Sequence, residues 1–133
     1  MDRVLDRIWI GSSRDADTPL AALGFSAVID LRDGRRSVSD DRVLVYKLVN
    51  RDGDPWAADQ VRNALDFAER QVKRGRVLIM CDAAMSRSVA MTIGYLVRTG
   101  WDEASAHEAV RRARPKAAPR QRMLASVLAA IRS

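Results

Sequence analysis

The residues with the clearest chemical potential lie in one short segment past the middle of the chain. Cys81 is the only cysteine among the 133 residues, and Arg87 and Ser88 follow it after five intervening residues. A thiolate is a strong nucleophile, and the arginine fork can hold two oxygens of one phosphate, which a lysine cannot do. The spacing therefore predicts a phosphate-binding loop in which the sulfur of Cys81 attacks phosphorus.

The segment between the cysteine and the arginine completes the predicted anion site. Its backbone N–H groups can wrap around phosphate oxygens, and a helix that begins after the loop adds the positive end of its dipole. The same donors favour the thiolate form of Cys81. Ser88 is expected to hydrogen-bond the sulfur and make it a better leaving group. The predicted substrate-binding residues are Asp82, Ala83, Ala84, Met85, Ser86 and Arg87.

Strands alternate with helices in the pattern that must position this loop. Residues 76–80 form an apolar run that predicts a central strand, and residues 88–99 predict an apolar helix after the loop. Ligands of open α/β sheets bind beyond the carboxyl ends of strands, so the loop is well placed. We expect an α/β layer fold with a largely parallel sheet. The other expected strands are 7–10, 27–31 and 43–49, and the other expected helices are 17–23, 56–74, 102–114 and 119–131.

Length and composition indicate one globular domain, residues 1–133, with no apolar run long enough to cross a bilayer. The N-terminus carries no apolar signal region, so a soluble cytoplasmic protein is expected.

The net charge of +6 comes from twenty Arg against three Lys. It fits anionic partners and, equally, the codon usage of a GC-rich genome. No basic run is interleaved with aromatics, so nucleic-acid binding is not favoured. A single cysteine excludes an intramolecular disulfide and a zinc site made of cysteines.

The loop resembles that of the cysteine-dependent dual-specificity and tyrosine phosphatases. The chain as a whole resembles a small bacterial- or archaeal-type member of that family. The family loop reads His-Cys-x-x-Gly-x-x-Arg-Ser, and this chain matches it at Cys81, Ala83, Ser86, Arg87 and Ser88. Residues 8–12, 23–31 and 113–124 resemble further parts of the family. The resemblance implies a single central sheet of four to five strands flanked by helices, with no metal and no cofactor. It implies hydrolysis of phosphomonoesters through a cysteinyl-phosphate intermediate, with phosphotyrosine proteins as the leading substrates and phosphoserine or phosphothreonine proteins also accepted.

The resemblance also implies a general acid on a loop before the cysteine. Asp52 fits this role best, because it lies twenty-nine residues before Cys81 and is followed by glycine. Asp54 is the alternative general acid. Whichever of the two is not the acid helps to build the turn. Residues 30–33, at the end of a predicted strand, either line the same site or are ordinary strand-end charges.

Three residues depart from the family pattern. Met80 stands where the family has histidine, Ala84 replaces the loop glycine, and Asp82 places a negative charge beside the cysteine. If position 84 needs a left-handed backbone, alanine strains it by about 1 kcal/mol or more. Asp82 opposes an incoming phosphate. A catalytically weak or dead pseudophosphatase that binds phosphate or phosphopeptides is therefore one alternative. A phosphatase of RNA 5′ ends or phosphoinositides is another.

Overall fold

The computed structural model describes residues 1–34 and 36–133, and within them one five-stranded sheet carries four α-helices. The strand order is β1-β2-β5-β3-β4; β1 pairs with β2 antiparallel and every other pair is parallel. The expected α/β fold, with a largely parallel sheet of four to five strands, is confirmed. The strands are β1 (Asp2–Leu5), β2 (Ile8–Gly11), β3 (Phe25–Asp30), β4 (Leu44–Lys47) and β5 (Arg76–Met80), and the helices are α1 (Ala58–Gln71), α2 (Arg87–Arg98), α3 (Glu103–Ala113) and α4 (Gln121–Arg132).

Both faces of the central strand β5 are buried, which explains its continuous apolar run. Side chains alternate across a strand, so Val77 and Ile79 enter the core under the four helices. Leu78 and Met80 enter a second core on the opposite face, which also contains Leu20. Met80 is fully buried there. The chain thus packs an apolar side chain at the position where the phosphatase family that it resembles has histidine.

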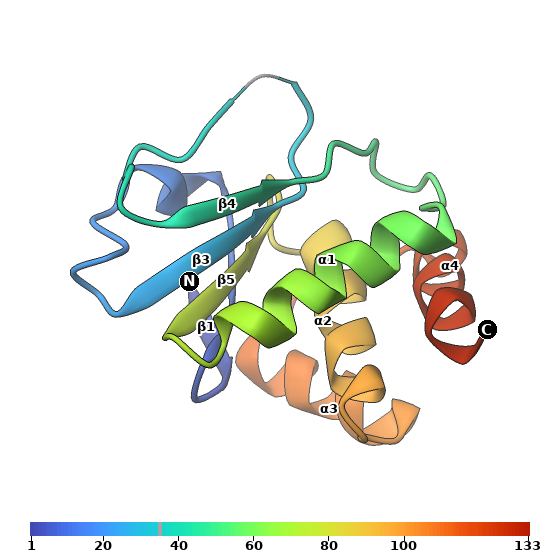
Figure 1. Ribbon diagram of the computed structural model, residues 1–133. Coiled ribbons are helices and arrows are strands. Elements are labelled where there is room, and N and C mark those ends of the chain that lie inside the picture. Colours follow the sequence, from blue (N-terminus) through green and yellow to red (C-terminus); the bar gives the residue numbers. More distant parts are fainter. Residues whose placement is uncertain (35) are drawn as a thin grey trace.

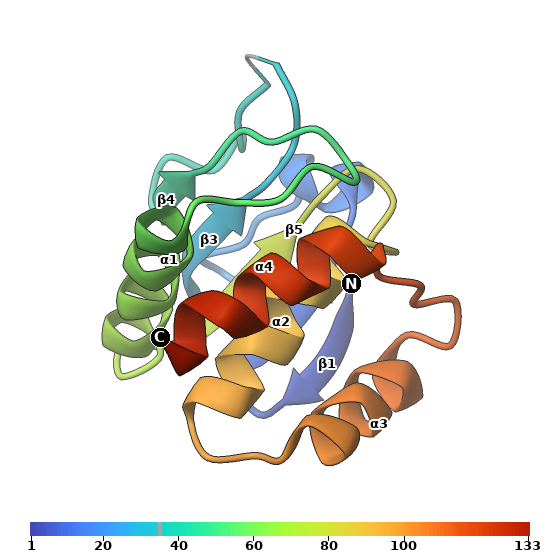
Figure 2. The same cartoon turned by 90° about the vertical axis from the view of Figure 1, so that its right-hand side faces the viewer.

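The carboxyl ends of the four parallel strands, β2 to β5, meet at one edge of the sheet. The arrowheads of β3, β4 and β5 point to the same edge, and the segments 31–34, 48–57 and 81–86 leave from it (Figure 1). In a view turned by 90°, the first turn of α4 lies beside the loop that follows β5 (Figure 2). Segments distant in sequence therefore surround the loop that carries the cysteine.

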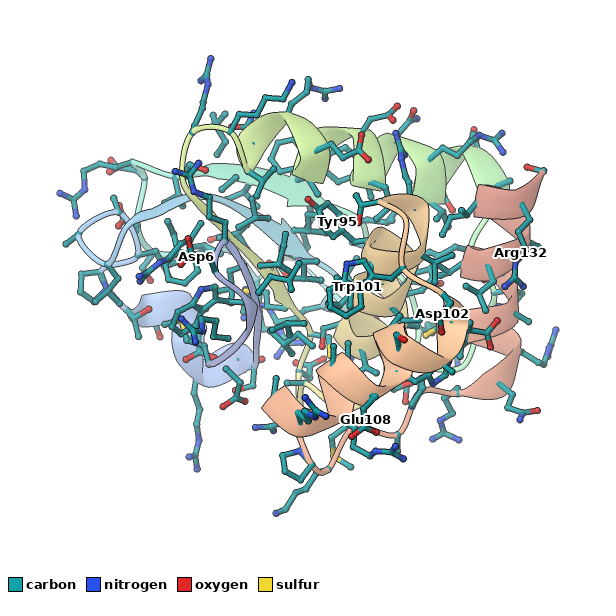
Figure 3. The ribbon with its side chains drawn as sticks, turned by 90° about the horizontal axis from the view of Figure 1, so that it is seen from below. Asp6, Tyr95, Trp101, Asp102, Glu108 and Arg132 are labelled. Atoms are coloured by element: carbon teal, nitrogen blue, oxygen red, sulfur yellow. The ribbon has the colours of Figure 1, made fainter. Side chains whose placement is uncertain are left out.

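The helices after this loop are fixed by one close contact and one cap. A Cβ atom at Gly94 of α2 would lie 2.3 Å from Val127 Cγ1 of α4, so glycine lets the two helices touch. Asp102, labelled at the start of α3 in Figure 3, accepts a hydrogen bond from the backbone N–H of Ser105 at 2.9 Å. These contacts hold α3 and α4, and with them the segment that connects the two helices.

Two parts of the N-terminal region differ from the sequence-based expectation. The helix expected over residues 17–23 is wrong: a 3-10 helix η1 (Ser13–Asp17) precedes it, and the later residues form turns. Leu23 N–H reaches Pro19 O at 3.2 Å, but Gly24 follows with φ 92°. One turn is too short to repay the cost of starting a helix. Strand β1 was not predicted, because its four residues show no apolar alternation.

A buried ion-pair network at the end of β3 yields a stability prediction. Asp30 is fully buried and accepts bonds from Arg32 at 2.9 and 3.0 Å and from Lys47 at 3.1 Å. Asp30→Asn should lower the free energy of unfolding by about 3–5 kcal/mol, because it leaves buried Arg32 without its anion and also removes the partner of Lys47. Chemical denaturation measures this change, and a loss below about 1 kcal/mol would contradict the predicted role of the network.

The pH dependence of stability gives an independent measurement of the same network. Burial works against the charge of Asp30, but bonds from Arg32 and Lys47 outweigh it and place its pKa below the ordinary value. Stability from this group is therefore present above the unfolded-state pKa and is lost as the pH falls through the folded-state pKa. The free energy of unfolding of the unmodified protein should fall more steeply with decreasing pH below about pH 4. In Asp30→Asn this dependence on pH should be weaker.

Candidate active site

Cys81 lies directly after β5, at the bottom of the loop that leads into α2. The residue is 2% exposed, and its Sγ lies 3.1 Å from Ser88 Oγ. The backbone N–H of Ser88 points at the same sulfur at 3.4 Å. Two groups at the start of α2 can thus stabilise negative charge on this sulfur, as a nucleophile and as a leaving group.

Hydrogen bonds from neighbouring segments hold the carbonyl groups of the loop. The oxygens of Asp82, Ala83, Ala84 and Met85 all accept such bonds. The donors are Ser13 N–H to Asp82 O at 3.1 Å, Arg114 Nη2 to Ala83 O at 2.9 Å, Arg114 Nε to Ala84 O at 3.2 Å and Ala118 N–H to Met85 O at 2.8 Å. All four bonds come from outside the loop, so they fix the directions of its peptide planes.

The directions of these carbonyls determine where the next N–H groups point. In a planar trans peptide the N–H of residue i+1 is opposed to the C=O of residue i. The N–H groups of residues 83–86 therefore point away from the donors that hold the loop. In the part of the chain that the structure describes, no backbone N–H of residues 82–87 donates to a protein group. Such a set of free donors at a helix N-terminus is an anion-binding arrangement.

Position 84 adopts the left-handed backbone that the family glycine suggested. Ala84 has φ 56°, the only positive φ of a non-glycine residue among the described positions, and its methyl group is buried. Glycine reaches this region at no steric cost, whereas alanine is strained by about 1 kcal/mol. The loop keeps this shape because the four carbonyl bonds hold it from outside.

Substitutions at position 84 should therefore give unequal effects. Ala84→Gly exchanges relief of strain for the loss of a buried methyl group, so stability should change by less than about 1 kcal/mol. Ala84→Val places a branched side chain at positive φ in a filled core and should cost about 2–4 kcal/mol. Thermal unfolding of both variants measures the difference. Equal effects would mean that the backbone at this position is not left-handed.

Arg87 connects the loops at the edge of the sheet. Its Nη1 donates to Leu31 O at 3.1 Å, to Asn50 O at 2.9 Å and to Asp33 Oδ1 at 3.0 Å. Its Nη2 donates to Asp82 Oδ2 at 2.8 Å. The guanidinium is thus buried at 6% exposure and oriented by three separate segments. An oriented guanidinium loses little further entropy when it binds an anion.

Asp82 is the charged partner that the loop itself supplies. Its Oδ1 accepts from Ser13 Oγ at 3.0 Å and pairs with Arg36 Nη2 at 2.6 Å, while its Oδ2 meets Arg87. Partial burial works against ionisation of this carboxyl. The bonds from Arg87, Ser13 and Arg36 outweigh that effect and hold the pKa of Asp82 below its ordinary value. The ionised Asp82 carboxylate therefore pairs with Arg87, the arginine that the sequence predicts to bind phosphate.

The two candidate acids lie on the loop between β4 and α1. Asp52 Oδ2 pairs with Arg120 Nε at 3.3 Å, and the backbone N–H of Arg120 donates to Ser86 Oγ at 3.2 Å. Arg120 thus links Asp52 to the phosphate-binding loop. Among the described residues, Asp54 forms hydrogen bonds only through its backbone. Its N–H donates to Arg51 O, and its carbonyl oxygen accepts from the side chain of Asn50, both within the loop between β4 and α1. The connection through Arg120 joins Asp52, the preferred acid from the sequence, to the loop that follows Cys81.

Three residues of the site received no definite functional assignment from the sequence. Arg114 braces the loop, Arg36 pairs with Asp82, and Asp33 contacts Arg87. Asp33 lies in the 30–33 segment that was expected either to line the site or to be ordinary strand-end charge, and its side chain does reach the site. No local pattern singles out Arg114 or Arg36 among twenty arginines, because only the fold brings them to the loop.

Residues 1–34 and 36–133 contain neither a candidate metal site nor a candidate membrane span. No group of three His, Cys, Asp or Glu side chains converges there in a way that could hold a metal ion. None of the helices in these residues combines the length and apolarity needed to cross a bilayer.

Solved structures with the same fold include proteins described as dual-specificity phosphatases or as tyrosine phosphatase-like. Human DUSP28 is 23% identical, with a TM-score of 0.91 over 99% of this chain and 96% of that chain. A mouse putative dual specificity phosphatase complexed with zinc tungstate is 23% identical, with a TM-score of 0.90 over 98% and 86%. PTPMT1 in complex with PI(5)P is 17% identical, with a TM-score of 0.80 over 98% and 93%. No protein-family model and no curated protein sequence matches this chain. The comparison confirms the fold that the loop motif implied.

Proposed function

We propose that this protein is a cysteine-dependent phosphomonoester hydrolase, a protein phosphatase of tyrosine or dual specificity. The observation that carries the proposal is the loop of free N–H groups that starts next to Cys81 and ends at the buried Arg87. Such a loop suits a tetrahedral oxyanion, and a sulfur nucleophile at its base suits attack on phosphorus. A cytoplasmic location remains part of this proposal.

The first half of the proposed reaction transfers the phosphoryl group to sulfur. The Cys81 thiolate attacks phosphorus, an S–P bond forms, and the bond from phosphorus to the leaving oxygen breaks. Asp52 donates a proton to that oxygen, so the product leaves as a neutral alcohol or phenol. Arg87 and the N–H groups of residues 82–87 bind the phosphoryl oxygens while negative charge moves through the transition state.

The second half returns the enzyme to its starting state. Asp52, now a carboxylate, takes a proton from water, and the water oxygen attacks phosphorus. The S–P bond breaks and inorganic phosphate leaves. The hydroxyl of Ser88, 3.1 Å from the sulfur, donates a hydrogen bond to the departing thiolate. Each proton and electron pair is accounted for by these groups and water, so the scheme needs no cofactor.

Phosphotyrosine proteins are the leading proposed substrates, and phosphoserine or phosphothreonine proteins are the next. Ala83 and Met85 of the loop are exposed. Few side chains of the loop therefore stand between the anion site and solvent. The fold neighbour PTPMT1 was solved with PI(5)P, which makes a phosphoinositide a third substrate to compare. Phosphate release from one phosphopeptide of each type and from PI(5)P ranks the three classes.

A rate–pH profile with para-nitrophenyl phosphate tests the acid. Asp52→Asn should lower kcat by about a hundredfold or more and remove the alkaline limb of the profile, because no group then protonates the leaving oxygen or takes a proton from the attacking water. Asp54→Asn is the matched control, with the same change two residues away, and should keep both kcat and the profile. The opposite result for the two variants would transfer the acid role to Asp54.

A binding module is the second candidate function, and one observation favours it. Asp82 occupies a donor of Arg87 and places a like charge next to the phosphate site. A protein that binds phosphate and releases no product from any of the substrates above would be a phosphate- or phosphopeptide-binding pseudophosphatase. Retention of phosphate binding in Cys81→Ser, together with inactivity of the unmodified protein, would establish that function.

A further inference from the structure

The contacts of Arg87 leave only one edge of its guanidinium for a phosphate. Nη1 has three acceptors, Leu31 O, Asn50 O and Asp33 Oδ1, for its two hydrogens. Nε has no acceptor among the described residues. A bidentate oxyanion must therefore use the Nε and Nη2 edge, the same edge through which Arg32 binds Asp30 in this protein.

Asp82 already binds one nitrogen of that edge. Its Oδ2 lies 2.8 Å from Arg87 Nη2, so a phosphate oxygen bound by this edge and Asp82 Oδ2 must share that nitrogen. The low pKa of Asp82 keeps its carboxyl ionised near neutral pH, and two anions at one donor repel each other. Asp82 must therefore weaken its contact with Arg87 whenever a phosphate binds both nitrogens.

The other oxygen of Asp82 has its own partners, which do not include Arg87. Oδ1 accepts from Ser13 Oγ and pairs with half-exposed Arg36. Asp82 also borders a hollow of about 360 Å³ that Ser13 lines and Arg87 does not. The carboxyl can therefore turn away from Arg87 toward this hollow while it keeps its two bonds on Oδ1.

We propose that Asp82 competes with phosphate for Arg87, and that Arg36 and Ser13 are positioning residues that hold Asp82 aside when phosphate binds. The inference rests on the phosphate site of the proposed function, but it does not require turnover. Arg36 acts here through Asp82 and does not contact the phosphate.

Calorimetric titration of inorganic phosphate into the full chain tests this competition. Asp82→Ala should tighten the Kd about five- to tenfold, because the competing charge-assisted bond is gone. Arg36→Gln should weaken the Kd about three- to fivefold, and Ser13→Ala should weaken it less, because Asp82 then stays on Arg87. Arg42→Gln is the matched control: it removes one exposed arginine of the same loop, whose partner is Asp40.

The double variant separates this mechanism from direct binding. In the Asp82→Ala background, Arg36→Gln should no longer change the phosphate Kd, because its effect passes through Asp82. An equal loss in both backgrounds would show that Arg36 touches phosphate and would overturn the inference. An unchanged Kd in Asp82→Ala would overturn it as well. If the Kd values shift as expected but no substrate is hydrolysed, the inference stands and the proposed function falls.

Discussion

Replacement of Cys81 by serine is expected to reduce phosphomonoester hydrolysis by at least about a thousandfold while the protein stays folded. Serine has nearly the same shape, but its hydroxyl is a far weaker nucleophile and a poorer leaving group than a thiolate. The free N–H groups of the loop and Arg87 are unchanged, so phosphate binding should persist. Rates with para-nitrophenyl phosphate and the Kd for inorganic phosphate measure both parts of this result.

The neighbouring hydroxyl gives the matched control for that change. Ser88→Ala removes the group 3.1 Å from the sulfur but keeps the nucleophile, so it should lower kcat by about ten- to a hundredfold. Hydrolysis by Cys81→Ser at more than about a tenth of the unmodified rate would mean that another group attacks phosphorus.

Substitution of Arg87 by lysine should have the second largest effect, a loss of about a hundred- to a thousandfold in kcat/KM. Lysine keeps the charge but loses the fork that binds two phosphoryl oxygens. It also cannot reach Leu31 O, Asn50 O and Asp33 together, so the loops around the site lose a shared donor. Kinetics with para-nitrophenyl phosphate measure the first effect, and thermal unfolding measures the second.

Arg98→Lys serves as the control for the arginine substitution. Arg98 lies on the same helix and also forms ion pairs, with Asp66 and Glu69, but these partners belong to α1 and not to the site. Its activity should match that of the unmodified protein. A similar fall in kcat/KM for both variants would indicate a general effect on α2 instead of a role of Arg87 in phosphate binding.

Local patterns predicted the elements that carry the site. The strand over residues 76–80 and the helix after the loop are present within one residue of their expected bounds. A short apolar run between glycine and a polar loop is typical of a buried strand, and the longer apolar segment after the loop is typical of a helix. The left-handed backbone at Ala84 was also foreseeable from the family glycine. In both cases the determining interactions lie within a few residues of one another.

The groups that surround the loop could not be read from sequence in the same way. Arg114 lies about thirty residues after the loop, and Arg36 lies about forty-five residues before it, so their contacts exist only once the sheet and helices have formed. The role of Met80 also depends on the second core, which no periodicity in its own strand reveals. Long-range contacts thus account for what the sequence left open.

Trapping of the covalent intermediate tests the central claim most directly. Asp52→Asn should slow the attack of water on the phosphocysteine more than it slows formation of the phosphocysteine, because para-nitrophenolate is a good leaving group, whereas the water has lost its general base. Rapid mixing with para-nitrophenyl phosphate and a quench should therefore leave phosphate on the protein. Because Cys81 is the only cysteine, peptide mass spectrometry can assign a phosphorylated thiol to it without ambiguity. The account predicts one phosphoryl group on the peptide that contains Cys81. Hydrolysis with no phosphorylated Cys81, or with phosphate on another residue, would contradict it.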